Sequence, residues 1–153
     1  MSAKIVVKTY LKDSEQFIPY SEFENEIKDP DYIEGAIELS VEGVPLLTLD
    51  LWDYVDQLWA YIVQGLQDVA AGQEFFTHFP DQPIELKIIP VNEKLWKIKV
   101  KVDEEVSVVA NRGEFVSALS EEAKNFFEFL SRKVPQNKGA YEELLSSLEK
   151  IHK

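Results

Sequence analysis

The sequence predicts an α+β fold with a largely antiparallel sheet of about six strands and helices on one face of that sheet. Segments in which apolar and polar residues alternate occur in two blocks of three, and this alternation is typical of antiparallel strands with one buried face. Each block is followed by a segment whose apolar residues recur every three or four positions, which is the period of an amphipathic helix. A last short helical segment gives the order β-β-β-α-β-β-β-α-α.

The length of the chain favours one domain. Its 153 residues are close to the commonest domain size and too few for two ordinary cores. Hydrophobic residues make up 45% of the sequence, which is far from the composition of disordered chains. We therefore expect a single α+β domain over residues 1–153.

The first block holds a strand, an irregular excursion and a hairpin. Residues 4–11 are rich in β-branched and aromatic side chains and indicate a strand. Residues 13–31 contain two prolines and many acidic residues, so we expect irregular structure there. Residues 33–49 indicate a hairpin, because apolar side chains alternate with polar ones and Glu42-Gly43 is a typical two-residue turn.

The clearest helix follows this hairpin. Asp50 is the predicted N-cap, Asp53 belongs to the first turn, and Gly72 ends the helix. Its apolar stripe consists of Leu51, Val55, Leu58, Ile62, Leu66 and Val69. Trp52 and Trp59 widen this stripe, so we expect the helix to pack against the sheet and also against a second helix or another subunit.

The second block repeats this plan. Residues 84–91, 94–103 and 105–111 indicate three strands, and the middle one alternates apolar side chains with Lys97, Lys99 and Lys101. An amphipathic helix then follows and is stopped by Pro135, and a last short helix ends the chain. Lys87 and the three lysines of the middle strand form a basic patch on the outer face or edge of the sheet.

The negative charge is unevenly distributed. The chain has 28 acidic and 16 basic residues, for a net charge of −12. Between Asp13 and Asp56 there are thirteen acidic residues and one basic residue, Lys28, so this segment alone holds a net −12. The rest of the chain is neutral. An acidic surface attracts basic proteins and repels nucleic acid and acidic membrane surfaces, although it also serves solubility alone.

Several chemistries find no support in the sequence. The chain has no cysteine, which excludes thiol nucleophiles, disulfides and thiolate metal sites. Its six glycines form no phosphate-binding motif, and no apolar run is long enough for a transmembrane helix or a secretory signal. Asp50, Asp53 and Asp56 lie three apart, but helix capping and solvation explain them more simply than a metal does. We expect a cytoplasmic protein with no metal, cofactor or catalytic residue.

Two groups of residues are candidate sites. The first is the acidic segment, as a partner-binding surface: Glu22, Glu24, Glu26, Asp29, Asp31 and Glu34. The second is the aromatic loop that follows the long helix, as the wall of a pocket: Trp59, Phe75, Phe76, His78 and Phe79. His78 lacks the partners of a catalytic triad, so we interpret it as a loop histidine.

Three segments carry a resemblance to known proteins. The strings DLWDYVDQLWAYIVQGL, FFTHFPDQPIELKI and FVSALSEEAKNFFEFL resemble an uncharacterised bacterial family of unknown function, over about residues 34–133. Some proteins of related architecture look like immunity proteins, which protect a cell against a secreted toxin. The resemblance therefore implies a binding role and no catalytic residue.

The sequence leads to one main hypothesis and two alternatives. The main hypothesis is a non-enzymatic acidic binding protein, of immunity or inhibitor type, that docks on a basic protein. The first alternative is a small-ligand-binding or enzymatic domain, with a pocket between the sheet and the tryptophan-rich helix near Trp59 and His78. The second is a protein that self-assembles through the wide apolar face of that helix.

Overall fold

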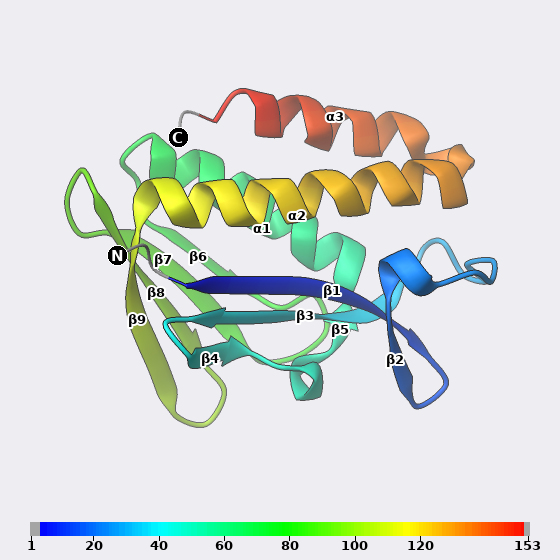
Figure 1. Cartoon of the computed structure of the whole chain (residues 1–153), viewed down its shortest axis with the longest axis horizontal. Helices are drawn as coiled ribbons and strands as arrows, with labels where there is room; N and C mark the ends of the chain where they lie inside the picture. Colours follow the sequence, from blue (N-terminus) through cyan, green and yellow to red (C-terminus); the bar gives the residue numbers. More distant parts are fainter. Residues whose placement is uncertain (1–3, 152–153) are drawn as a thin grey trace.

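The computed structural model describes residues 4–151 of the chain (Figure 1). In chain order, the elements of this part are β1 (Ile5–Asp13), β2 (Gln16–Pro19), the 3-10 turn η1 (Tyr20–Glu22), β3 (Glu34–Val41), β4 (Val44–Leu47), η2 (Leu49–Leu51), β5 (Asp53–Tyr54), α1 (Val55–Ala70), β6 (Phe75–His78), β7 (Glu85–Pro90), β8 (Leu95–Lys101), β9 (Glu105–Asn111), α2 (Arg112–Lys133), η3 (Pro135–Asn137) and α3 (Lys138–Glu149).

The predicted α+β class with antiparallel pairing is confirmed, but the strands form two sheets instead of one. In the first sheet the order is β2-β1-β3-β4, with β5 also paired to β3. In the second sheet the order is β6-β7-β8-β9. The prediction of about six strands in one sheet differs from this because β2, β5 and β6 are only two to four residues long and carry little alternation. Among residues 4–151, no pairing joins a strand before α1 to a strand after it, so the strands form two separate sheets.

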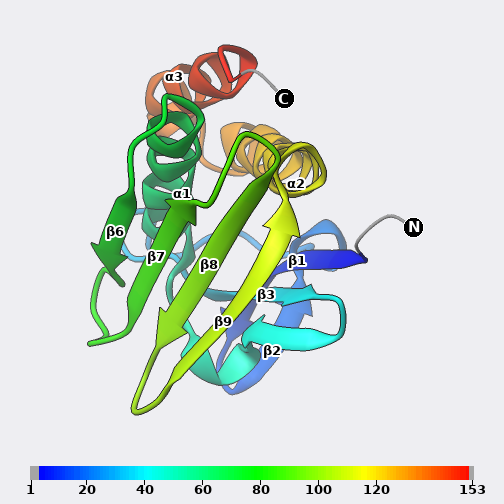
Figure 2. The same ribbon diagram turned by 90° about the vertical axis from the view of Figure 1, so that its left-hand side faces the viewer.

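The helices lie together on one side of the two sheets. Helix α1 contacts β3, β6 and β7, and α2 contacts β1 and β9, so both helices bridge the first and second sheets. Helix α3 packs on the outer side of α1 and α2 (Figure 1). Buried side chains from both sheets and all three helices form one hydrophobic cluster. No helix within residues 4–151 covers the outer face of the second sheet (Figure 2).

The start of α1 differs from the sequence prediction. The helix begins at Val55, and its N-cap is Tyr54 instead of Asp50. Asp50 lies in the 3-10 turn η2, and Asp53 lies in β5. Asp50, Asp53 and Asp56 therefore do not share a helical face. The predicted end is confirmed: Gly72 has φ +92° and follows the helix, as a left-handed C-cap residue does.

The predicted hairpin turn and the predicted end of the second long helix are also confirmed. Glu42 and Gly43 join β3 to β4 with φ angles of 53° and 79°, the positive values that a two-residue hairpin turn of type I′ needs. Helix α2 begins after Asn111, whose side chain accepts a hydrogen bond from the amide N–H of Glu114 at 3.0 Å. It ends at Lys133, before Pro135.

The acidic excursion between β1 and β3 is held against α2. The ring of Tyr20 lies edge-on to Phe126 and Phe129, with ring centroids 5.5 and 5.3 Å away. The Lys133 ammonium donates a hydrogen bond of 2.9 Å to the carbonyl of Asn25. The excursion therefore has a fixed position on the body of the protein. Among residues 4–151, no helix is long and apolar enough to cross a membrane.

Candidate functional site

The structure places the six predicted partner-binding residues on the surface near one end of the first sheet. We call Glu22, Glu24, Glu26, Asp29, Asp31 and Glu34 the acidic face. All six are exposed. They lie in η1, in the connection from η1 to β3, and at the first residue of β3 (Figure 1). The two acidic residues of the β1–β2 hairpin, Asp13 and Glu15, precede them along the chain.

A recess of about 690 Å³ opens in the acidic face. It lies between the end of the β1–β2 hairpin and the connection that leads to β3. Its acidic lining residues are Asp13, Glu26, Asp29 and Glu34, its basic ones are Lys12 and Lys28, and its apolar and aromatic ones include Phe23, Ile27, Tyr32 and Ile33. Tyr32 is 57% exposed, so its ring is accessible to a partner in this recess. The recess thus combines negative charge with aromatic surface.

A second, smaller recess adjoins the first at Glu34. Its volume is about 250 Å³, and it is lined by Glu34, Trp52, Asp53, Tyr54, Asp81 and Gln82. Glu34 borders both recesses. The ring of Tyr54 from the second recess lies 5.3 Å from the ring of Tyr32 in the first. The two recesses therefore form one acidic and aromatic region, which we call the Glu34 site.

Asp53 fixes the wall of the Glu34 site. Its side chain is almost fully buried, and its carboxylate accepts hydrogen bonds from the amide N–H groups of Tyr54, Asp81 and Gln82 at 2.7 to 3.1 Å. The Gln82 side chain also donates to the carbonyl of Trp52 at 2.7 Å. A buried carboxylate needs such donors to offset its lost hydration. Asp53 is therefore a structural residue that ties the turn at 81–82 to β5.

The chain already places one cation on an aromatic ring of this site. The Lys12 ammonium lies 4.6 Å from the centre of the Trp52 ring, and it donates a hydrogen bond of 2.7 Å to the carbonyl of Ser14. Such a position over a tryptophan face is a favourable cation–π contact. The Trp52 ring therefore offers a surface that suits ammonium and guanidinium groups.

Asp56 lies in the first turn of α1, close to the acidic face. Burial raises the pKa of its carboxyl to about 6, and the nearby Asp31 carboxylate raises the pKa further, while backbone N–H groups oppose the rise. One oxygen, Oδ1, is buried and accepts no hydrogen bond from the described residues. The Asp56 carboxyl thus changes its protonation state near pH 6 beside the acidic face.

The residues of the predicted aromatic pocket are divided between the core and the surface. Trp59 is fully buried on α1, and its indole N–H donates a hydrogen bond of 3.0 Å to the Thr9 hydroxyl of β1. Phe75 and Phe79 are buried in the core. In contrast, Phe76 is 50% exposed, and its ring lies 5.1 Å from the ring of the exposed His78. Trp59 therefore lies in the core, whereas His78 lies on the surface.

The predicted basic patch lies on the outer face of the second sheet, whose strands Figure 2 shows. Lys97, Lys99 and Lys101 alternate along β8 with the buried Trp96, Ile98 and Val100, and Lys87 of β7 lies opposite Lys99. Their charge is partly balanced. Glu74 lies 3.8 Å from the Lys87 ammonium, and Glu85 and Glu105 lie in register with Lys101 on either side.

Within residues 4–151, no group of three or more histidine and acidic side chains is arranged to hold a metal ion. Comparisons with family models, with curated proteins and with solved structures found no match to this chain.

Sequence reasoning found the acidic face but missed the rest of the Glu34 site. Trp52 was interpreted as part of the helix and Asp53 as a first-turn residue, whereas both lie before α1. Tyr32 and Tyr54 gave no pattern that linked them, because their contact depends on the pairing of Glu34 with Tyr54 between β3 and β5. Trp52, Asp53 and Tyr54 are adjacent in the sequence, but this cluster indicates a binding site only when the pairing of β3 with β5 is known.

Proposed function

We propose that this chain is a non-enzymatic binding protein, of immunity or inhibitor type, whose acidic face docks on a basic protein. The observation that carries the proposal is the Glu34 site, where exposed carboxylates and aromatic rings surround two adjoining recesses. Interfaces draw much of their binding energy from a few aromatic and arginine residues in such recesses.

The distribution of charge supports the same proposal. Residues 13–56 hold a net charge equal to that of the whole chain, and the six carboxylates of the acidic face are exposed. None of these six makes an ion pair of 4 Å or less with a described residue. Unpaired exposed charge of one sign accelerates the encounter with a partner of opposite sign, and this effect weakens as salt increases.

The chemistry of the Glu34 site suits a lysine or arginine side chain of the partner. Tyr54 provides an aromatic ring, and Glu34 and Asp81 provide carboxylates at the same recess. The contact of Lys12 with Trp52 within the chain is an example of the same recognition. An arginine is well suited because its planar guanidinium stacks on aromatic rings and pairs with carboxylates at the same time.

The proposal is tested by affinity capture from lysate of the source organism at low and high salt. The bait proteins are the intact chain and a variant with Glu22→Gln, Glu24→Gln, Glu26→Gln, Asp29→Asn and Asp31→Asn. We expect the intact chain to capture a basic protein at low salt, with capture reduced at least tenfold in the variant and at high salt. Loss of several charge pairs at an interface is sufficient for a change of this size.

A matched control separates the acidic face from general acidity. This control neutralises five exposed acidic residues elsewhere: Glu93, Asp103, Glu104, Glu105 and Glu143. It loses the same number of negative charges and should capture the partner like the intact chain. If both variants lose capture equally, or if the intact chain captures no basic protein, the proposed function is wrong.

A further inference from the structure

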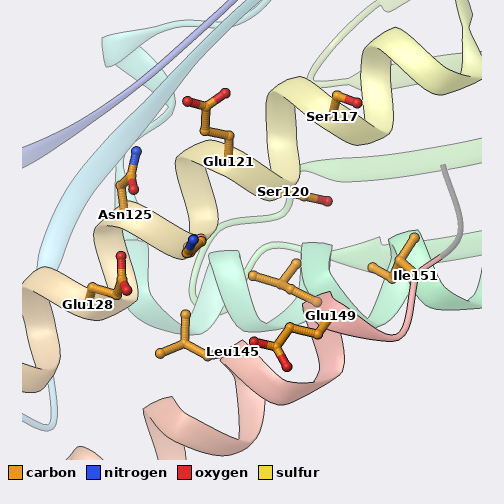
Figure 3. A pocket seen from close by; sticks show the side chains of 10 residues that line it. Ser117, Ser120, Glu121, Asn125, Glu128, Leu145, Glu149 and Ile151 are labelled. Atoms are coloured by element: carbon orange, nitrogen blue, oxygen red, sulfur yellow. The ribbon is translucent and has the colours of Figure 1, made fainter.

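A groove of about 580 Å³ runs between helices α2 and α3 (Figure 3). Its α2 wall includes Ser120, Lys124 and Glu128, and its α3 wall includes Leu145, Leu148 and Glu149. Successive residues of these three on α2 are four positions apart, so they share one side of that helix. The volume lies within the range of small-molecule sites in proteins.

Ser120 marks this groove as more than a gap between two helices. Ser120 is 6% exposed, and its hydroxyl oxygen is buried without a hydrogen-bond partner among the described residues. Serines within helices usually point to water or donate to the carbonyl four residues earlier. Ser131 of the same helix does the latter, with a hydrogen bond of 2.9 Å to the carbonyl of Phe127. The Ser120 hydroxyl is thus an unused polar group on the wall of the groove.

The charges around the groove favour a cationic ligand. Glu121, Glu128 and Glu149 line it together with a single basic residue, Lys124. Lys124 lies within 4 Å of none of these carboxylates, because the ion pairs of the described residues are Lys87–Glu74 and Lys138–Glu142. The lining therefore carries an uncompensated charge of −2. Ammonium groups satisfy such carboxylates, and a hydroxyl oxygen can accept a hydrogen bond from the same ammonium.

The α3 wall of the groove is apolar, so a ligand that fits it also needs apolar groups. Leu145, Leu148 and Ile151 line this side, and Leu145 points from α3 toward α2 in Figure 3. The groove follows the two helices, and Ser120 and Glu128, eight residues apart on α2, are separated by about 12 Å along its axis. A matching ligand is therefore extended, with methylene groups between its positive charges.

We propose that the groove between α2 and α3 binds a linear aliphatic polyamine. Its ammonium groups pair with Glu128 and Glu149 and donate to the Ser120 hydroxyl, and its methylene groups lie on Leu145 and Leu148. This site is separate from the Glu34 site and does not depend on the proposed function.

Isothermal titration calorimetry with spermidine at about 0.15 M salt, near physiological ionic strength, tests the proposal. We expect one spermidine molecule per chain. Ser120→Ala removes only the hydroxyl, and it should weaken binding about tenfold, since a hydrogen bond to a charged group is lost. The double variant Glu128→Gln/Glu149→Gln should weaken binding by about the same factor, as two charge pairs of modest strength are lost.

The control is the double variant Asp103→Asn/Glu104→Gln in the exposed turn between β8 and β9. It removes the same charge as Glu128→Gln/Glu149→Gln and should bind spermidine like the unaltered chain. Thermal unfolding of each variant verifies that it folds. If the unaltered chain shows no binding at millimolar spermidine, or if the control weakens binding as much as the groove variants do, the polyamine site does not exist.

Discussion

The carboxyl groups of residues 53 and 56 illustrate how similar side chains near α1 serve different purposes. Asp53 is buried and accepts hydrogen bonds from three backbone N–H groups, so its charge is well compensated. Asp56 is partly buried, and its Oδ1 has no partner among the described residues. Burial therefore raises the pKa of Asp56 to about 6, and ionisation of this side chain works against folding.

This difference predicts a pH-dependent stability. An aspartate in an unfolded chain has a pKa of about 3.9, so between about pH 4 and pH 6 the folded state binds more protons than the unfolded state, and stability falls as pH rises. Above pH 6 the cost is on the order of 2–3 kcal/mol. We expect Asp56→Asn to stabilise the protein by about that amount at pH 8 and much less at pH 4, as measured by urea unfolding.

The exposed Asp103 provides the control for this residue. Asp103→Asn should change the free energy of unfolding by less than about 0.5 kcal/mol, as surface substitutions usually do. If Asp56→Asn destabilises the protein at pH 8, or if its effect is the same at pH 4 and pH 8, the carboxyl group is not held in the environment described.

At the scale of elements, the contact between α1 and β6 depends on a glycine. A Cβ atom added at Gly65 would lie 2.5 Å from a ring carbon of Phe75, which is buried. The strand can therefore approach the helix only because residue 65 has no side chain. Alanine is favoured over glycine in helices by about 1 kcal/mol, but overpacking of a core costs about 1–3 kcal/mol.

We therefore expect Gly65→Ala to lower the free energy of unfolding by about 1–2 kcal/mol, as measured by denaturant unfolding. The control is Gly139→Ala in α3, where an added Cβ meets no atom within 4 Å, and this change should be neutral or slightly stabilising. Adding Phe75→Leu to Gly65→Ala should relieve part of the cost. A Gly65→Ala variant as stable as the unaltered chain would show that α1 and β6 are not packed this closely.

The sequence predicted long elements better than short ones. The helices and the strands of seven or more residues were found because their apolar periodicity extends over many positions. Strands β2, β5 and β6 escaped prediction because they are at most four residues long and exist through pairing with β1, β3 and β7. Alternation shows which side of a strand is buried but not which strand lies beside it, and for this reason the division into two sheets was not predicted.

The candidate site, like the fold, was predicted only in the part that depends on local sequence. The acidic face depends on composition along one segment, so the sequence alone located its six carboxylates. The Glu34 site depends on the pairing of β3 with β5 and on the turn held by Asp53, which join residues far apart in the sequence. Trp59 and His78 were predicted to share a pocket because the aromatic loop with His78 follows the helix that carries Trp59, but Trp59 is buried in the core and His78 is exposed.

At the scale of the whole molecule, the negative and positive charges lie on different parts of the surface. The negative charge is concentrated in residues 13–56, and the lysines of β7 and β8 lie on the uncovered face of the second sheet (Figure 2). Such a distribution orients the molecule toward a basic partner before contact and raises the rate of association. The charge distribution therefore favours the approach of a basic partner to the acidic face, as the proposed docking requires.

Amide hydrogen exchange with and without the captured basic protein is the most direct test of this docking. We expect slower exchange in residues 22–34 and 52–54 when the partner is bound, because the Glu34 site and the acidic face become covered. Exchange in β8 and β9 should remain unchanged. Protection confined to the second sheet or to α2 and α3, with none in residues 22–34, would contradict the central claim that the acidic face is the docking surface.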